Sequence, residues 1–91
     1  MATRSLLVGY DLNRPGQDYS RLIEAIEAYG TWWHSLDSTW IIKTPKSVTQ
    51  VRDELRRHID SSDELFVAEL TGHAAWSGFD QTSSEWLKKY L

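Results

Sequence analysis

The chain has no cysteine, only one methionine and two prolines, and no long hydrophobic run. Without cysteine it can form neither a disulfide framework nor a thiolate metal site. The apolar stretch near the N-terminus is too short for the core of a signal peptide. No segment approaches the roughly 20 apolar residues that a membrane-spanning helix needs. These absences predict a soluble, cytoplasmic protein with no membrane partner.

The composition is that of one small globular domain. Of the 91 residues, 41% are hydrophobic and 25% are charged, which is enough apolar material for a modest core. We expect a single domain over residues 1–91, with its core in residues 5–72 and a C-terminal segment over residues 73–91. The net charge of −3 argues against a nucleic-acid binder as a whole, although a local basic face could still act.

Hydrophobic periodicity predicts the element order strand, helix, strand, strand, helix, strand, followed by a C-terminal helix. The strands are expected over residues 5–12, 31–36, 39–44 and 64–71, and the first helix over residues 19–29. Asp18 is the expected N-cap of that helix and Gly30 its terminator. Ser47 and Thr82 each begin a capping-box pattern, and these predict the starts of the other two helices.

This order is typical of a split βαβ arrangement, so the predicted fold is an α+β ferredoxin-like βαββαβ sandwich. Two helices would cover one face of a four-stranded antiparallel sheet. We expect the first and fourth strands at the centre, because both read as apolar on both faces. The other face needs a cover, from the C-terminal helix or from a second copy. We therefore predict a homodimer formed through the open face or the strand edges.

Asp11 is the leading candidate for chemistry, because it closes an apolar strand where the chain leaves the core. An aspartate at this position can act as a metal ligand or a general base, and it can also simply form the turn. Asn13 could add a second oxygen ligand. Since Mg²⁺ prefers oxygen ligands and one or two carboxylates, a symmetric dimer could form a Mg²⁺ site from two copies of Asp11.

Basic residues are concentrated in one stretch, from Lys43 through Lys46 to Arg52 and Arg56. Arg52 and Arg56 are four residues apart and so share a helix face that could hold phosphates of RNA or DNA. With Arg14, in the loop after the first strand, these are the candidate nucleic-acid-binding residues. The alternative is a solvated face neutralised by the neighbouring acidic residues.

Several familiar catalytic and cofactor motifs are missing. The sequence has no P-loop, no glycine-rich dinucleotide fingerprint and no nucleophile elbow, so these forms of nucleotide binding and acyl transfer have no support. No pair of histidines has the spacing of a zinc site. The five tryptophans can fill a core, form an interface or stack bases.

The stretch from Val8 to Leu12 resembles the tyrosine–aspartate signature that closes the first strand of the small CRISPR-associated adaptation protein, the second of that series. The segment from Ser38 to Trp40 is similar to that family's serine–valine–phenylalanine segment. The chain as a whole most resembles a compact group of SinR-like bacterial proteins, which is related to that family and to VapD-like toxins. The resemblance covers residues 5–72. It departs from the family pattern at Leu36, where the family has a glutamine.

The resemblance implies a ferredoxin-like fold, a homodimer and a connection to nucleic acid. It also implies that Asp11 takes part in metal-dependent cleavage of phosphodiesters, as in some members of the family. The first hypothesis is accordingly a metal-dependent endoribonuclease or a nucleic-acid-associated protein. The alternative is a non-catalytic homodimeric module for protein interactions, in which Asp11 only closes a strand.

Overall fold

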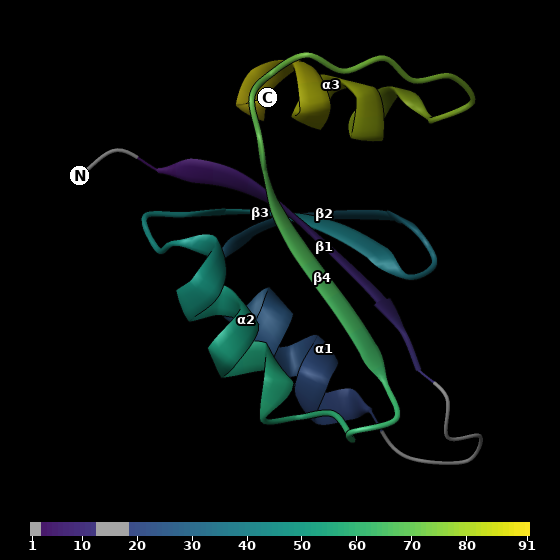
Figure 1. Cartoon of the computed structure of the whole chain (residues 1–91). Coiled ribbons are helices and arrows are strands. Elements are labelled where there is room, and N and C mark those ends of the chain that lie inside the picture. The colour runs from purple at the N-terminus through teal and green to yellow at the C-terminus, as the bar shows by residue number, and fades with distance from the viewer. Residues whose placement is uncertain (1–2, 13–18) are drawn as a thin grey trace.

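The computed structural model describes residues 3–12 and 19–91. It contains a four-stranded antiparallel sheet and three helices, with α1 and α2 on one face and α3 on the other (Figure 1). The elements are β1 (Arg4–Asp11), α1 (Ser20–Glu27), β2 (Thr31–Leu36), β3 (Thr39–Thr44), α2 (Val48–Arg56), β4 (Glu64–Leu70) and α3 (Gln81–Tyr90). Within the described part of the chain, no helix has the length and apolar character required to cross a bilayer.

The strand order is β2-β3-β1-β4, so β1 and β3 are central and β4 lies at an edge. The prediction that the first and fourth strands form the central pair is therefore wrong. The reason can be read from burial: Trp40, Ile41 and Ile42 are three consecutive buried residues in β3, as expected of a strand covered on both faces. In β4, by contrast, Phe66 is 64% exposed.

The hairpin of β2 and β3 is confirmed, with Asp37 and Ser38 between the paired residues Leu36 and Thr39. No described residue other than glycine has a positive φ. The reversal is therefore not one of the primed turns that match the twist of a regular hairpin. Consistent with this, the pairing of β2 with β3 shifts register between Trp33 and Leu36.

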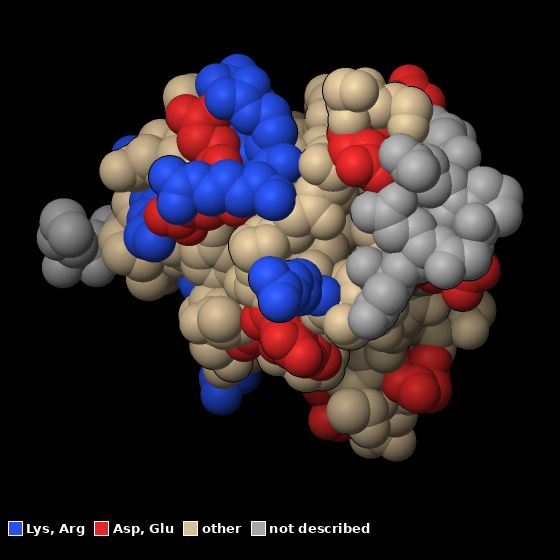
Figure 2. Space-filling model, turned by 90° about the horizontal axis from the view of Figure 1, so that it is seen from below, with Lys and Arg blue, Asp and Glu red and all other residues tan. Residues whose placement is uncertain are grey.

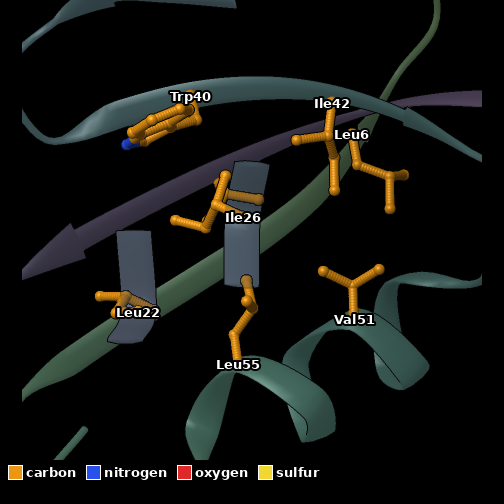
Figure 3. Close-up of a cluster of buried hydrophobic side chains, with 8 residues drawn as sticks. Leu6, Leu22, Ile26, Trp40, Ile42, Val51 and Leu55 are labelled. Carbon is orange, nitrogen blue, oxygen red and sulfur yellow. The ribbon is translucent and has the colours of Figure 1, made fainter. Parts of the chain in front are cut away.

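The main core lies between the sheet and the pair α1 and α2 (Figure 3). It consists of eight residues that are at most 1% exposed: Leu6, Val8, Leu22, Ile26, Trp40, Ile42, Val51 and Leu55. The predicted capping box at the start of α2 is confirmed, because the Ser47 hydroxyl accepts from Gln50 N and the Gln50 side chain accepts from Ser47 N. The predicted N-cap of α1, Asp18, lies outside the described residues.

A second, smaller core lies on the opposite face of the sheet, under α3. Its buried members are Trp33, Ile41 and Leu87, with Trp76 and Phe79 packed against them. The predicted C-terminal helix is present, but its N-cap is Asp80, whose carboxylate accepts from Ser83 N at 2.8 Å. The capping box predicted at Thr82 is therefore wrong, because that residue already lies inside the helix.

Candidate functional site

Asp11 lies directly opposite Glu64 in the antiparallel pairing of β1 with β4. Residues that face each other across such a pair have their Cβ atoms about 4.5–5.5 Å apart, and their side chains emerge on the same face. Both residues are exposed. Two carboxylates from a single chain therefore occupy one end of the sheet.

The face on which these carboxylates lie follows from their neighbours. Tyr10 and Leu65 pack against the core beneath α1 and α2. Because side chains alternate along a strand, Asp11 and Glu64 lie on the other face of the sheet. A hollow of about 450 Å³ adjoins them, and its lining also includes Gly9 and Phe66.

The carboxylates of Asp11 and Glu64 are suitable ligands for a hard divalent cation that keeps most of its water ligands. Mg²⁺ is commonly bound through one or two carboxylates, with the remaining positions filled by water and substrate oxygens. Within residues 3–12 and 19–91 no group of three or more His, Cys, Asp or Glu side chains could hold a metal ion. Asp11 and Glu64 could therefore supply the one or two carboxylates that an open Mg²⁺ site takes.

Arg52 and Arg56 project from α2 close to β4. Both guanidinium groups approach the carboxylate of Asp53, at 2.8 Å and 3.4 Å respectively. Both arginine side chains remain at least half exposed, so each guanidinium keeps donors that can reach solvent or a phosphate. Figure 2 views the molecule from the side of α1 and α2 and shows acidic atoms interleaved with the basic ones.

Three hollows that share Leu65 in their lining lie along β4, between the arginines on the α2 side and the carboxylates on the opposite face of the sheet. One hollow of about 450 Å³ is lined by Arg52 and Arg56 together with the acidic residues Asp60 and Asp63, and another of about 210 Å³ has Arg52 and Phe66 in its lining. Phe66 also lines the hollow beside Asp11, and Leu65 lines all three. We call this surface, from Asp11 and Glu64 past Phe66 to Arg52 and Arg56, the β4 edge surface.

Lys43 and Lys46, two of the other basic candidates, do not belong to the β4 edge surface. Lys43 lies on the α3 side, where its Nζ donates to Ser5 Oγ at 3.0 Å and to the Tyr90 carbonyl at 3.2 Å. Lys46 Nζ donates to Glu54 Oε2 at 2.6 Å, beside the ring of Tyr29. The structure therefore separates Lys43 and Lys46 from the two arginines.

Lys46, Glu54 and Tyr29 form a network between α1 and α2. The Tyr29 hydroxyl also donates to Glu54. The hydrogen bond from Lys46, assisted by that from Tyr29, lowers the pKa of Glu54 below its usual range. Burial, followed by the bond to the Glu54 carboxylate, raises the pKa of Tyr29. These shifts indicate a structural ion-pair network rather than groups tuned for proton transfer near neutrality.

Two predicted site residues, Asn13 and Arg14, lie outside the described residues. The sequence alone does not identify two further candidates, Glu64 and Phe66. Glu64 becomes a candidate only when the register of β1 with β4 is known, because nothing in the local sequence connects it to Asp11. The sequence predicts Phe66 in a central strand, whereas its exposure follows from the position of β4 at the sheet edge.

Comparisons of this chain with protein-family models, with curated proteins and with solved structures found no match.

Proposed function

We propose that this protein is a metal-dependent endoribonuclease in which Asp11 and Glu64 together hold a divalent cation. The observation that carries the proposal is the direct cross-strand pairing of these two exposed residues. Two like charges facing each other on a sheet are unfavourable unless something neutralises them. A bound cation would do so.

The fold supports the same proposal. We assign it to the ferredoxin-like class, on the basis of the βαββαβ order, the strand order β2-β3-β1-β4 and the position of α1 and α2 on one face. The proposed relationship to SinR-like proteins, to the CRISPR-associated adaptation family and to VapD-like toxins rests on the strand end at Asp11 and on the segment from Ser38 to Trp40.

Each part of the β4 edge surface has a proposed task. A divalent cation held by the two carboxylates would polarise the phosphodiester and make a water molecule more acidic. Arg52 and Arg56 would bind flanking phosphates through the donors that Asp53 leaves free. The exposed ring of Phe66, between the acidic and the basic groups, would stack on a base.

A single strand is the preferred substrate over a duplex, because a base can reach the Phe66 ring only when it is unpaired. The test is cleavage of matched single-stranded RNA, duplex RNA and DNA oligonucleotides with Mg²⁺ or Mn²⁺. We expect Asp11→Asn and Glu64→Gln each to lower the rate by an order of magnitude or more. Glu24→Gln, a change at an exposed acid on α1, serves as the matched control and should leave the rate unchanged.

Substrate binding provides a second readout that is independent of the chemical step. We expect Arg52→Gln to weaken RNA binding and to flatten its dependence on salt, since each phosphate contact releases counterions. Phe66→Ala should weaken binding of single strands without changing the salt dependence. Unchanged cleavage in both carboxylate variants would assign any observed activity to another site or to a contaminant.

A non-catalytic homodimeric module is the second candidate function. It is favoured by one row of residues that runs across all four strands, in which Leu36 pairs with Thr39, Thr39 with Gly9, and Gly9 with Phe66. Leu36 and Phe66, at the two ends of this row, are 46% and 64% exposed. A second copy packed on this row would bury both. Sedimentation of the wild type and of Phe66→Glu tests it, since only the wild type should dimerise.

A further inference from the structure

A hollow of about 340 Å³ lies between α1 and α2, which run side by side on one face of the sheet (Figure 1). The apolar part of its lining consists of Ala25 and Ala28 from the end of α1 and Leu55 from α2. Because alanine carries only a methyl group, the end of α1 leaves open space beside α2. We call this space the α1–α2 hollow. None of its described lining residues belongs to the three hollows of the β4 edge surface.

The polar part of the lining is mostly basic. Lys46 precedes α2, Arg57 and His58 follow it, and all three line the α1–α2 hollow. The one acid among the described lining residues is Glu54. The charges of Lys46 and Arg57 therefore outnumber the single negative charge at this hollow, although the whole chain carries a net charge of −3.

Glu54 is already neutralised inside the protein. Its carboxylate accepts from Lys46 Nζ at 2.6 Å and from the Tyr29 hydroxyl. These two hydrogen bonds are the main causes of its lowered pKa, and the positive charges of Lys46 and Arg57 lower that pKa further. Glu54 thus stays ionised but is paired, and the Arg57 guanidinium lies close enough to influence it.

The side-chain donors of Arg57 and His58 are unused. Among residues 3–12 and 19–91, neither side chain has a hydrogen-bond or ion-pair partner. Arg57 differs in this respect from Arg52 and Arg56, whose guanidinium groups both approach Asp53. A guanidinium has five N–H donors and an imidazole has at least one. Two consecutive residues therefore bring free donors to the α1–α2 hollow.

We propose that the α1–α2 hollow binds a phosphate monoester that carries a small apolar group. The phosphate oxygens accept from Arg57 and His58, because the planar fork of a guanidinium matches two oxygens of a phosphate. The Lys46 ammonium adds a second positive charge at the same hollow. The apolar group lies against Ala25 and Ala28. The volume of about 340 Å³ is that of a small-molecule site, and such sites combine apolar walls with a few polar groups.

A terminal phosphate fits this hollow better than a phosphate within a nucleic-acid strand. Residues of α1 and α2 bound the hollow on two sides, whereas a strand must leave each of its phosphates in two directions. A monoester is attached on one side only and carries roughly −1.5 to −2 charges at pH 7. Its free oxygens can all turn to the basic side chains while the ester group faces the alanines.

The test titrates the whole protein with phenyl phosphate, inorganic phosphate and benzyl alcohol, at an ionic strength held constant with sodium chloride. Two-dimensional ¹H–¹⁵N spectra follow the backbone signals of Arg57 and His58. We expect phenyl phosphate to shift them saturably and to bind at least about threefold more tightly than inorganic phosphate, since its ring covers apolar surface. Benzyl alcohol has the ring without the phosphate, and we expect it to leave both signals in place.

Three variants complete the test. Arg57→Gln removes the guanidinium and should weaken binding of phenyl phosphate about tenfold, the worth of hydrogen bonds to a charged group. Ala28→Leu fills the hollow without changing a charge and should also weaken binding. Lys88→Gln removes an exposed cation from α3, on the opposite face of the sheet, and is the matched control that should bind as the wild type does. Arg57 and Ala28 are both exposed, so we expect their variants to fold.

Four results would overturn the proposal: no saturable binding of phenyl phosphate, equally tight binding of benzyl alcohol, wild-type affinity in Arg57→Gln or in Ala28→Leu, or equal affinity for phenyl phosphate and inorganic phosphate. The last result would assign the hollow to free phosphate. Loss of binding in Arg56→Gln together with wild-type affinity in Arg57→Gln would move the phosphate to the β4 edge surface. None of these outcomes depends on RNA cleavage, and Asp11→Asn should bind phenyl phosphate as the wild type does, so this proposal and the proposed function can fail separately.

Discussion

Asp11 faces Glu64 across the antiparallel pairing of β1 with β4, so two acidic residues form one cross-strand pair. Like charges in this position destabilise a sheet by roughly 0.2–1 kcal/mol. In metal-free buffer we therefore expect Asp11→Asn and Glu64→Gln each to raise the free energy of unfolding by a few tenths of a kcal/mol. Urea denaturation measures this change, and Glu24→Gln controls for the loss of one surface charge.

The same pair predicts how stability responds to metal. Mg²⁺ that binds the folded chain alone raises its melting temperature by mass action. The wild type and Glu24→Gln should both show this rise, while Asp11→Asn and Glu64→Gln should not. An equal rise in all four proteins would show that Mg²⁺ acts elsewhere on the molecule.

Two apolar positions should differ sharply in their contribution to stability. Leu55 is fully buried in the main core, so Leu55→Ala should cost about 2–5 kcal/mol of unfolding free energy. Phe66 is 64% exposed, and Phe66→Ala should cost less than about 1 kcal/mol. Denaturant titration of the two variants checks this. A large loss for Phe66→Ala would mean that its ring is covered in solution.

The start of α3 can be tested by two neighbouring substitutions. Asp80→Ala removes the carboxylate that accepts from Ser83 N and should cost about 1 kcal/mol. Thr82→Ala changes a residue inside the helix, where alanine is the better helix former, and should cost nothing or stabilise slightly. Thermal unfolding of the two variants compares them. The reverse ranking would restore Thr82 as the N-cap.

The network of Tyr29, Glu54 and Lys46 predicts a dependence of stability on pH. The pKa of Glu54 is lower in the folded chain than in the unfolded chain, where it is about 4.5. Glu54 therefore contributes to the free energy of unfolding above that pH, and this contribution is lost as the pH falls. The pKa of Tyr29 is raised above its ordinary value of about 10. Its contribution to the free energy of unfolding is therefore present below about pH 10 and is lost as the pH rises further.

Tyr29→Phe should therefore flatten the stability profile at both ends of the pH range. At acidic pH the expected change in the free energy of unfolding is below about 1 kcal/mol, because the Glu54 side chain is more than a third exposed and solvent screens its charge. Urea denaturation at a series of pH values measures it. A profile identical to that of the wild type would contradict the role of this network.

Much of the fold could be predicted from local patterns. The hairpin around Asp37, the capping box at Ser47 and the amphipathic spacing of α1 and α2 are set by residues close in sequence. The strand order was not predicted correctly, because it depends on which strands are buried from both sides. The useful signal was the run from Trp40 to Ile42, three consecutive buried residues in a strand bounded by polar ones.

The candidate site was only partly predictable. Asp11 could be found because it ends an apolar strand. Glu64 could not, because it lies 53 positions after Asp11 in the sequence and only the register of β4 brings the two together. The same holds for Phe66 and Arg52, which line one hollow although they come from different elements.

The most direct test of the cation site exchanges the ligand for one of different softness. Because the chain has no cysteine, Asp11→Cys introduces a single thiolate at the site. Hard Mg²⁺ prefers carboxylate oxygens, whereas soft thiolates select softer metals such as Cd²⁺. The measurement is RNA cleavage by Asp11→Cys with Mg²⁺ alone and with Cd²⁺ added. We predict no cleavage with Mg²⁺ and recovery with Cd²⁺; full activity of Asp11→Cys with Mg²⁺ alone would contradict the account.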